Sequence, residues 1–435
     1  MPAKTDRRHR QGQESRQRII DAALAIAAER GYDGTTVALI TERAEVPASS
    51  VYWQFKNKDE LLAEALDYSY RTWRREGPTW QPANYSGSPR ERIMTRLRLS
   101  TGSIETEPEY WRLGLMVSML RKTRRIAAQE RFMLVRQETI LILDEWWRSV
   151  LPQIGEDAPA LTDLLSRSYL SLVDGLFVAH RATPSLDLQR LCALVGEGMA
   201  DAAQKWASDV PGSLQHVHEP VEPAVEAALE GASDDSRERL LRAAEEIASE
   251  RGYKGTTISR ICKQAGLPAS SVYWFFADKD ELLAEVVQHS WDEWSAAQPA
   301  WNPPEPGQTW DAALRAILRR SVRSLLDAPS FMRIGHMLTL EQHSEDVAAR
   351  ARFLVIRKGI EEGIAGWFAE FLPPAAIDAE PALPHVLAQT LIAATDGFFI
   401  GHQIDDAEPS VPGFVEFLVD ILASTVARAT ESEVH

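Results

Sequence analysis

The sequence predicts an all-α protein that contains two tandem copies of one helical unit. Residues 15–64 align without a gap with residues 236–285, and the two segments are identical at 31 of these 50 positions. Apolar residues recur at helical spacing in both copies, and we find no convincing stretch with the alternating pattern of a strand. Because the period is far longer than that of a solenoid, we expect each copy to be a complete globular unit.

The composition narrows the class of protein further. The 435 residues are 45% hydrophobic and 25% charged with a net charge of -16, which excludes a wholly disordered chain. Two cysteines, Cys192 and Cys262, exclude a disulfide scaffold and a multi-cysteine zinc site. No run of about 18 apolar residues predicts a membrane span, and the N-terminus lacks the apolar segment of a secretory signal. We therefore expect a cytoplasmic protein without membrane contact.

The similarity continues downstream and sets the expected domain boundaries. Asp174–His180 matches Asp396–His402 after one inserted residue, so the duplication spans the whole chain. The segment between the copies is rich in Pro, Gly, Ser and Glu, which is typical of a linker. The predicted divisions are an amino-terminal arm with a first domain of short helices at 1–60, a larger helical domain at 61–207, a linker at 208–235, a second domain of short helices at 236–281 and a second larger helical domain at 282–435.

Each copy opens with signals for three short helices. In copy 1, Arg16–Arg30 carries an apolar stripe at helical spacing and is followed by Gly31, a suitable C-terminal cap. Thr35 and Thr36 supply hydroxyl caps for a second helix with its apolar residues on one face. Each copy therefore begins with a helix and a capped second helix.

The third helix follows a short turn. Glu45–Val46 forms the turn, and Pro47 suits the first turn of the helix that comes next. Val51 and Phe55 are its inward residues. From about residue 90 to 206 the pattern is one of long amphipathic helices, so the remainder of the copy is also predicted to be helical.

Three short helices with a tight turn match the helix-turn-helix plan, in which the third helix enters the DNA major groove. The outward residues of this helix are small, hydroxylated, aromatic or amide side chains: Ala48, Ser49, Ser50, Tyr52, Trp53 and Gln54. Such side chains can contact bases and phosphates without bringing a carboxylate to the DNA. Lys58, at the start of the next helix, is placed for a phosphate. On periodicity alone, an ordinary amphipathic helical hairpin explains the pattern as well.

The residue pattern is more specific than the periodicity. Gly-Tyr-x-Gly-Thr-Thr followed by Val-Tyr-Trp-x-Phe-x-[Asn/Asp]-Lys-Asp-Glu-Leu occurs twice, and it resembles the TetR family of bacterial transcriptional regulators. The resemblance implies that each copy has a DNA-binding domain followed by a helical domain for ligand binding and dimerisation. It implies DNA-backbone contacts from Thr36, Ser50, Trp53, Gln54 and Lys58 and base contacts from Ala48, Ser49 and Tyr52. The corresponding residues of copy 2 are Thr257, Ser271, Trp274 and Lys279, then Ala269, Ser270 and Tyr273.

The two copies depart from the family pattern in different ways. Copy 1 has Glu45 where the family usually has a glycine, and a left-handed non-glycine residue costs about 1 kcal/mol. Copy 2 loses two polar positions, because Phe275 stands at the position of Gln54 and Ala277 at that of Lys56, but it gains Arg260 and Lys263. We therefore expect both copies to bind double-stranded DNA, with an operator that is an imperfect palindrome.

Family members pair through their last two long helices. Here these helices are predicted at 160–181 and 185–207, then at 384–404 and 412–430. Because both copies lie in one chain, we expect copy 1 to pair with copy 2 as a single-chain pseudo-dimer that is monomeric in solution. Pairing within one chain has a high effective concentration set by the linker.

Large apolar and polar residues of the later helices are candidates for an effector site. They are Trp111, Met116, Phe132, Trp146, Trp147, Phe177 and His180 in copy 1 and Phe331, His336, Met337, Trp367, Phe398 and His402 in copy 2. An aromatic, apolar lining suits a small hydrophobic or amphipathic molecule. The same spacing equally describes an ordinary core, and the polar residues equally suit buried hydrogen bonds.

No motif for an enzyme or a cofactor is present, so we predict no enzymatic activity, no cofactor and no metal. His216 and His218 lie in the predicted linker and are weak evidence for a metal. By resemblance, the chain is expected to be an effector-controlled transcriptional regulator, usually a repressor, in the bacterial cytoplasm and on the nucleoid when DNA-bound. Glu45 and Phe275 keep an alternative open, a ligand- or protein-binding sensor that has lost DNA binding.

Overall fold

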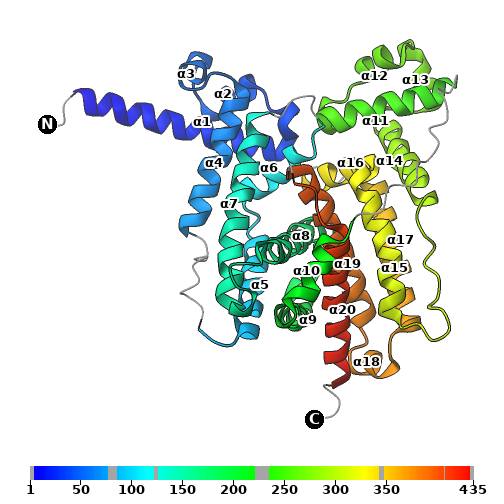
Figure 1. The fold of residues 1–435 in the computed structure, drawn as a ribbon. Coiled ribbons are helices and arrows are strands. Elements are labelled where there is room, and N and C mark those ends of the chain that lie inside the picture. The colour runs from blue at the N-terminus through cyan, green and yellow to red at the C-terminus, as the bar shows by residue number, and fades with distance from the viewer. Residues whose placement is uncertain are drawn as a thin grey trace.

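The structure is a computed structural model that describes residues 4–76, 86–121, 126–220, 235–341, 347–405 and 407–431, with side chains from residue 11 onward. Helices make up almost all of this part of the chain, and it contains no strand. The predicted all-α class and the two similar copies are therefore confirmed (Figure 1).

Head 1 is the three-helix unit at the start of copy 1. It consists of α1 (Lys4–Gly34), α2 (Val37–Ala44) and α3 (Ala48–Gln54). α1 bends at Gly31, whose φ of 69° is a conformation that glycine adopts readily. Because α1 already begins at Lys4, the residues predicted as an amino-terminal arm continue this helix instead.

Six helices form the body of copy 1. Among these helices, α8 and α9 face copy 2. Their bounds are α4 (Lys58–Glu76), α5 (Pro89–Glu105), α6 (Glu109–Ser118), α7 (Ala127–Val150), α8 (Pro159–Ala182) and α9 (Leu188–Ser208), with a short 3-10 turn at Pro152–Ile154.

Copy 2 repeats this plan. Head 2 contains α11 (Ser236–Gly255), α12 (Ile258–Ala265) and α13 (Ala269–Phe275), and α11 bends at Gly252 as α1 does at Gly31. The body contains α14 (Lys279–Ala296), α15 (Trp310–Ser324), α16 (Ser330–Leu340), α17 (Ala348–Phe371), α18 (Pro374–Ala379), α19 (Leu383–Ile404) and α20 (Val411–Glu431), with a 3-10 turn at Leu325–Asp327.

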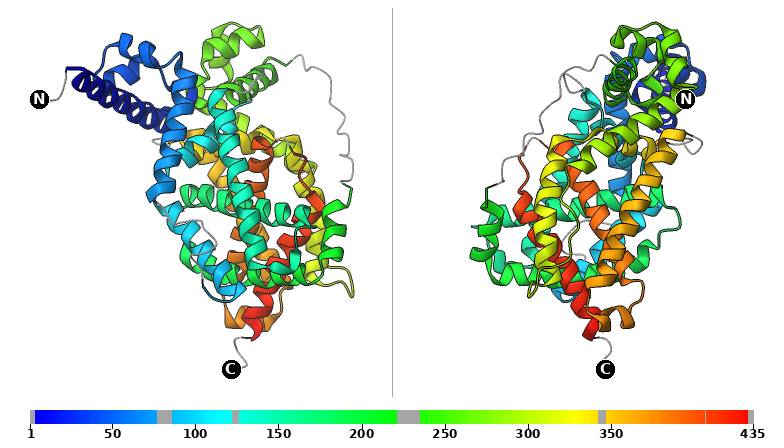
Figure 2. Two further views of the ribbon diagram at one scale, coloured as in Figure 1. Left: turned by 60° about the vertical axis from the view of Figure 1, so that its left-hand side comes forward. Right: turned by 90° about the vertical axis from the view of Figure 1, so that its right-hand side faces the viewer.

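The two copies pair within the chain through the predicted helices. α8 packs along α19 and α9 packs along α20, so the four helices form one bundle between the bodies (Figures 1 and 2). At the crossing of α8 and α19, Gly175 faces the carbonyl oxygen of Ala393, and Gly397 faces the carbonyl oxygen of Ser171. A Cβ at either glycine would lie 1.6 or 1.7 Å from that oxygen. The backbones therefore approach so closely that only glycine fits.

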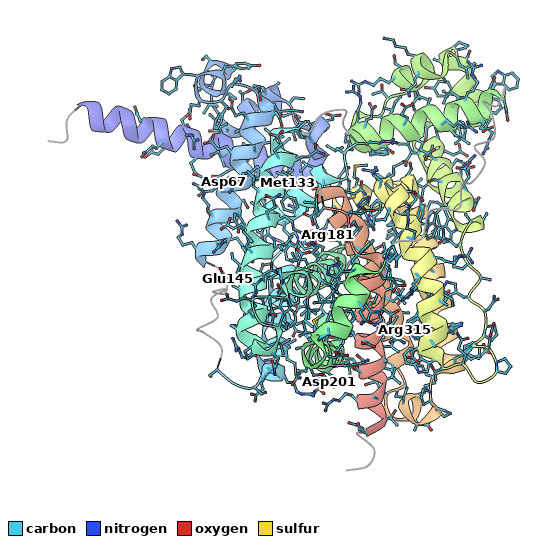
Figure 3. The ribbon with its side chains drawn as sticks, in the orientation of Figure 1. Asp67, Met133, Glu145, Arg181, Asp201 and Arg315 are labelled. Carbon is cyan, nitrogen blue, oxygen red and sulfur yellow. The ribbon has the colours of Figure 1, made fainter. Side chains whose placement is uncertain are left out.

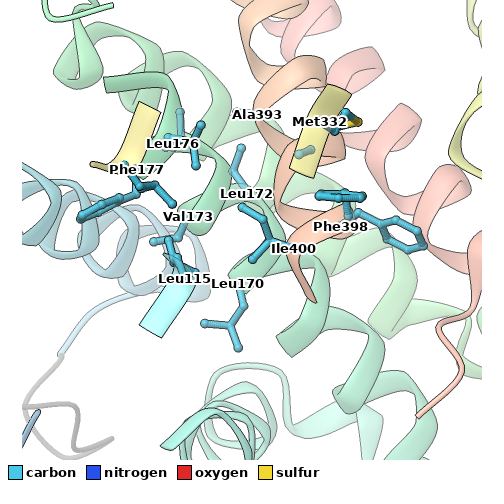
Figure 4. Close-up of a cluster of buried hydrophobic side chains, with 14 of the residues drawn as sticks. Leu115, Leu170, Leu172, Val173, Leu176, Phe177, Met332, Ala393, Phe398 and Ile400 are labelled. Atoms are coloured by element: carbon cyan, nitrogen blue, oxygen red, sulfur yellow. The ribbon is translucent and has the colours of Figure 1, made fainter. Parts of the chain in front are cut away.

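Apolar side chains from both copies fill the space around this crossing. Leu172, Val173 and Leu176 of α8 lie beside Ala393, Phe398 and Ile400 of α19 (Figure 4). These side chains are almost completely buried, and the hydrophobic core runs without interruption from one copy into the other. The burial of this apolar surface is the main term that holds the copies together.

Ion pairs border the same interface. At one end, Asp201 of α9 accepts hydrogen bonds from Arg428 of α20 at 2.7 and 3.1 Å (Figure 3). At the other end, Arg181 of α8 pairs with Glu107 at 3.0 Å, and its backbone oxygen accepts from Arg350 of copy 2. Half-exposed pairs of this kind add about 1 kcal/mol or less each and mainly fix the alignment of the helices.

The two heads lie next to each other at one end of the molecule, opposite the C-terminal end (Figures 1 and 2). α1 and α11 are in contact near their bends. Directly below them, the backbone N–H of Arg121 donates to the carbonyl of Ser249 at 2.8 Å, and Arg333 donates to the carbonyl of Met119 at 2.8 Å. Both bonds join one copy to the other, so the relative position of the heads depends on the pairing of the bodies.

The segment predicted as a linker, 208–235, differs from expectation in its first part. Residues Val210–His218 form a helix, α10, which packs against α20, α8 and α9. The ring of His216 lies 5.9 Å from that of Trp206, so packing explains this histidine. No group of three metal-binding side chains is present among the described residues. Residues 221–234 lie outside the described part of the chain.

One helix, α19, is long and apolar enough to cross a membrane by length and composition. However, 83% of its most apolar window is buried inside the structure. A helix at the centre of the inter-copy bundle needs this composition, because it is covered on all sides.

Candidate DNA-binding surface and core cavity

The turn between the second and third helices sets the direction of each recognition helix. Thr36 and Thr257 cap α2 and α12 by accepting hydrogen bonds from the backbone N–H groups of Leu39 and Arg260. Buried Val51 in α3 and buried Val272 in α13 fix the inner faces of the recognition helices. The opposite faces of α3 and α13 are therefore presented to solvent.

Two aromatic side chains stand out on each recognition helix. Tyr52 and Trp53 are 62% and 84% exposed, and Tyr273 and Trp274 are 60% and 85% exposed. Large aromatic side chains usually find cover in a folded protein, so four such groups at matching positions are a strong functional signal. Phe275 adds a third exposed aromatic ring on α13 only.

The smaller predicted contact residues accompany these rings. Ala48, Ser49, Ala269 and Ser270 are exposed, whereas Ser50, Gln54 and Ser271 are partly buried at the edges of the same faces. The structure thus brings the predicted residues of each third helix together on one surface.

The turns of the two heads differ as the sequence suggested. Glu45 adopts a left-handed conformation with φ 51° and ψ 47°, and Gly266 adopts the same conformation with φ 65° and ψ 33°. Both turns therefore have the same backbone geometry, but only in copy 1 does a residue with a side chain, Glu45, adopt the left-handed conformation.

Lys58 and Lys279 are held differently from the sequence-based prediction. The ammonium of Lys58 donates to the carbonyl of Tyr32 at 2.8 Å, and that of Lys279 donates to the carbonyl of Tyr253 at 3.1 Å. Each ammonium also lies over the ring of the same tyrosine. These lysines tie the body to the end of the first head helix. Their spacing from the recognition helix gave no sign of this role.

Arg260 is also engaged within its own head. Its guanidinium donates to the carbonyl of Gly255, which lies at the end of α11. Lys263, in contrast, is exposed. Of the two basic residues that copy 2 gains, Lys263 is therefore the one presented to a partner.

Comparison with known proteins agrees with this geometry. Residues 19–65 and 240–286 each match the family described as bacterial regulatory proteins, tetR family. The two matches cover the two heads and the start of the helix that follows each of them. The chain is a tandem duplication of TetR-like units.

Similar proteins include several TetR-like regulators. The HTH-type transcriptional repressor KstR of Mycolicibacterium smegmatis is 36% identical over 80 residues, which are 18% of this chain and 38% of that protein. The HTH-type transcriptional regulator AcrR of Shigella flexneri is 36% identical over 59 residues, 14% of this chain and 27% of that protein. The regulator TtgR of Pseudomonas putida is 42% identical over 62 residues, 14% of this chain and 30% of that protein. This chain thus matches well under half the length of each relative, and the relatives are regulators rather than enzymes.

The body of copy 1 contains a cavity of ≈ 50 Å³ between α4, α5, α6, α7 and α8. Aromatic rings and hydroxyl groups line it together, among them Tyr70, Trp73, Tyr110, Thr139 and Tyr169. Burial raises the pKa of Tyr110 well above its ordinary value, so its hydroxyl remains a neutral hydrogen-bond donor. Within the described residues, the Tyr110 hydroxyl forms no hydrogen bond.

Only two of the predicted effector residues line this cavity, namely Trp111 and Phe132. The other candidates of copy 1 lie elsewhere: Met116, Trp146, Trp147 and Phe177 are packed in the core, and His180 lies near the end of α8. The prediction selected large apolar residues, whereas the cavity lining also includes residues that combine a ring or short chain with a hydroxyl. The sequence signal that could have found them is a comparison of the two copies.

The candidates of copy 2 have structural partners. Phe331 packs against Trp291 and Trp294, and the indole of Trp367 donates to the carbonyl of Asn302 at 3.1 Å. Met337 is buried in the core. Phe398 and His402 border a separate cavity of ≈ 40 Å³ at the interface between the copies.

Asp174 and Asp396 occupy equivalent buried positions but have different partners. Asp174 accepts from the indole of Trp111 at 2.7 Å and pairs with Arg136 at 2.5 Å. Asp396 pairs with Arg357, and His336 lies 3.2 Å away.

In copy 2, the partner of the buried aspartate that replaces Trp111 comes from one helical turn further along α16. Met332 stands at the position of Trp111, and His336 stands at the position of Leu115. Burial disfavours the charge of Asp396, but Arg357 and His336 outweigh it and hold the pKa below its ordinary value. His336 therefore stabilises a buried carboxylate, and its role as a ligand contact stays a prediction.

Arg136 connects the cavity of copy 1 with the interface. It lines both the cavity in copy 1 and the cavity between the copies, and its guanidinium lies 3.8 Å from the position of a Cβ on Gly401 of copy 2. A molecule that displaced Arg136 would therefore act directly on the packing of copy 2 against copy 1.

Proposed function

We propose that this chain is a sequence-specific, DNA-binding transcriptional regulator that carries both DNA-reading heads of a TetR-like dimer in one polypeptide. The observation that carries this proposal is the pair of exposed aromatic residues on α3 and its counterpart on α13. Aromatic and hydroxyl side chains at these positions suit contact with thymine methyl groups, sugars and phosphates. The relatives that match the heads are regulators that include repressors, so repression in a bacterial cytoplasm is the expected outcome.

The pairing of α8 with α19 supports a monomeric, single-chain pseudo-dimer. The inter-copy bundle already occupies the helices through which two separate chains would otherwise pair. One chain would then cover both halves of an operator. Because the heads differ at Gln54 and Phe275, the operator would be an imperfect palindrome.

The core cavity of copy 1 supports control by a small amphipathic molecule. A ligand that binds one spacing of the heads better than the spacing required by DNA shifts the equilibrium away from the DNA complex. Arg136 provides the physical link, because it contacts both the cavity and the partner copy.

A gel shift with DNA from the region upstream of the gene tests the proposal. We expect a sequence-selective complex that contains one chain per DNA, as measured by light scattering. Tyr52→Ala combined with Tyr273→Ala should abolish this complex without changing the helical content, because both side chains are exposed. Absence of any complex with the natural chain would instead favour a sensor that no longer reads DNA.

A further inference from the structure

We infer that the bodies of the two copies differ in function, so that the body of copy 1 alone binds the effector and the body of copy 2 binds none. The inferred ligand is a neutral, mainly apolar molecule that carries a hydrogen-bond acceptor. This inference rests on the proposed function and specifies its regulation. Three independent differences between equivalent positions of the copies support it.

The first difference is the loss of hydroxyl groups from the core of copy 2. Around the cavity of copy 1, Tyr70, Tyr110, Thr139 and Tyr169 carry hydroxyls. Trp291, Phe331, Ile360 and Leu391 stand at the same places in copy 2. Hydroxyls on a buried apolar wall give a ligand orientation and specificity, whereas an apolar wall only fills space.

Within copy 1, some of these hydroxyl groups already have hydrogen-bond partners. Tyr169 shares a hydrogen bond of 2.6 Å with Ser100, and the Tyr70 hydroxyl accepts from Arg74 at 3.2 Å. The Tyr110 hydroxyl faces the cavity with no such partner among the described residues. It is the donor that a ligand carbonyl or ether oxygen would use.

The second difference lies in the outer cleft that leads to this core. In copy 1 a cleft of ≈ 700 Å³ lies between α4, α5 and α6, and Trp73 and Ser103 border both this cleft and the inner cavity. A volume of this size suits a small organic ligand. A Cβ at Gly102 would have no neighbour within 4 Å, so the cleft is open at this point.

The matching cleft of copy 2 carries more charged side chains, whereas those of the copy 1 cleft are Asp21, Arg98 and Glu109. Its volume is ≈ 620 Å³, but four uncharged positions of copy 1 are replaced by charged side chains. The replacements are Glu245 for Leu24, Glu293 for Thr72, Arg320 for Leu99 and Arg323 for Gly102. A neutral apolar molecule would have to strip water from these charges, which is unfavourable.

The third difference is that the chain itself enters the cleft of copy 2. Glu219 and Pro220, just after α10, line this cleft, and Arg319 donates to the Glu219 carboxylate at 2.5 and 3.0 Å. The segment that joins the copies is thereby anchored where a ligand of copy 2 would enter. Among the described residues, no joining segment lines the matching cleft of copy 1.

One bound molecule would still affect both heads. Arg136 lies between the cavity of copy 1 and the cavity at the interface, where it approaches Gly401 of copy 2. Displacement of Arg136 by a ligand would therefore alter the packing of copy 2 against copy 1.

Titration of the full chain with Nile red, a neutral polycyclic dye that carries a carbonyl group, tests this inference. We expect one saturable site per chain. Gly102→Arg reproduces Arg323 of copy 2 in a position with free space, and it should weaken dye binding at least tenfold. Tyr110→Phe should weaken it severalfold, and the matched control Arg323→Ala should leave both affinity and stoichiometry unchanged.

Two dye molecules per chain, loss of binding in Arg323→Ala, or no saturable site would overturn the inference. A gel shift on the same proteins separates this result from the proposed function. If the natural chain forms a DNA complex, DNA reading stands whatever the dye stoichiometry. If it forms none, the proposed function fails even when a single dye site is found.

Discussion

At the scale of single residues, the left-handed turn residue of head 1 is an unusual choice. Glu45 and Gly266 have nearly the same backbone conformation, but a side chain with φ near 51° meets its own backbone. Glu45→Gly should therefore raise the free energy of unfolding by up to about 1 kcal/mol. The mirror variant Gly266→Glu should lower it by a similar amount, because the nearest neighbour of its Cβ is the flexible end of Arg239 at 3.2 Å.

Urea unfolding followed by circular dichroism measures both changes. Equal stability of Glu45→Gly and the natural chain would mean that the glutamate side chain forms a compensating contact. A gel shift on the same variant then shows whether loss of that contact lowers the affinity for DNA.

Glu341 is a buried carboxylate that lies beside both heads. It lies at the end of α16, where its carboxylate approaches Gly31 of head 1 at 3.1 Å and Gly252 of head 2 at 3.8 Å, measured to the Cβ that each glycine lacks. Burial raises its pKa to about 7, although Lys254 and Lys279 of head 2 act in the opposite direction. Leu120 occupies the equivalent place in copy 1, so copy 1 has no carboxylate at the position of Glu341.

The raised pKa predicts how stability depends on pH. The folded chain holds a proton on Glu341 that the unfolded chain releases between about pH 4.5 and 7. The contribution of this residue to stability is therefore largest at low pH, falls as the pH rises through that window, and is constant above it. The total change is at most about 3 kcal/mol, since one pKa unit corresponds to about 1.4 kcal/mol.

Glu341→Gln isolates this contribution. The difference in unfolding free energy between Glu341→Gln and the natural chain should grow from pH 5 to pH 7 in favour of the variant and then level off. Urea titrations at half-unit intervals measure it. A difference that is the same at every pH would show that Glu341 titrates as an ordinary exposed glutamate.

At the scale of helices, the close contact of α8 and α19 is the most sensitive part of the fold. Gly175→Ala would place a methyl group 1.6 Å from a backbone oxygen of α19, which no rotamer change can relieve. We expect a loss of about 3 kcal/mol or more, at the upper end of overpacking effects. Thermal unfolding measures it, and Gly102→Ala is the control because its methyl group meets nothing and a helical alanine is favoured. An unchanged melting temperature for Gly175→Ala would contradict the close crossing.

Some elements could be predicted from the sequence because their signals are local. The heads have caps, a turn and buried positions that lie within a few residues of each other, so Thr36, Val51 and Tyr52 were assigned to the correct faces. The lining of the cavity depends on contacts between five helices, and the choice of Trp146 and Trp147 by size alone selected core residues. Lys58 belongs to the same class, since its partner Tyr32 is 26 residues away.

At the scale of the whole molecule, the fusion of two copies in one chain allows the two heads to have different residues. A homodimer must present the same surface twice, whereas this chain presents Glu42 and Gln54 in head 1 and Lys263 and Phe275 in head 2. A lysine attracts phosphates and a glutamate repels them, so head 2 should bind DNA more tightly and with the steeper dependence on salt.

Two symmetrised operators, each a true palindrome of one natural half-site, test this asymmetry. The natural operator should bind more tightly than either, because only it offers each head its own sequence. Tyr52→Ala should weaken binding to the natural operator less than Tyr273→Ala does, since it removes a contact from the weaker head. Gel shifts at two salt concentrations measure both effects, with light scattering to verify one chain per DNA. Equal losses for the two variants, together with equal affinities for the two palindromes, would mean that the heads are interchangeable despite their different charges.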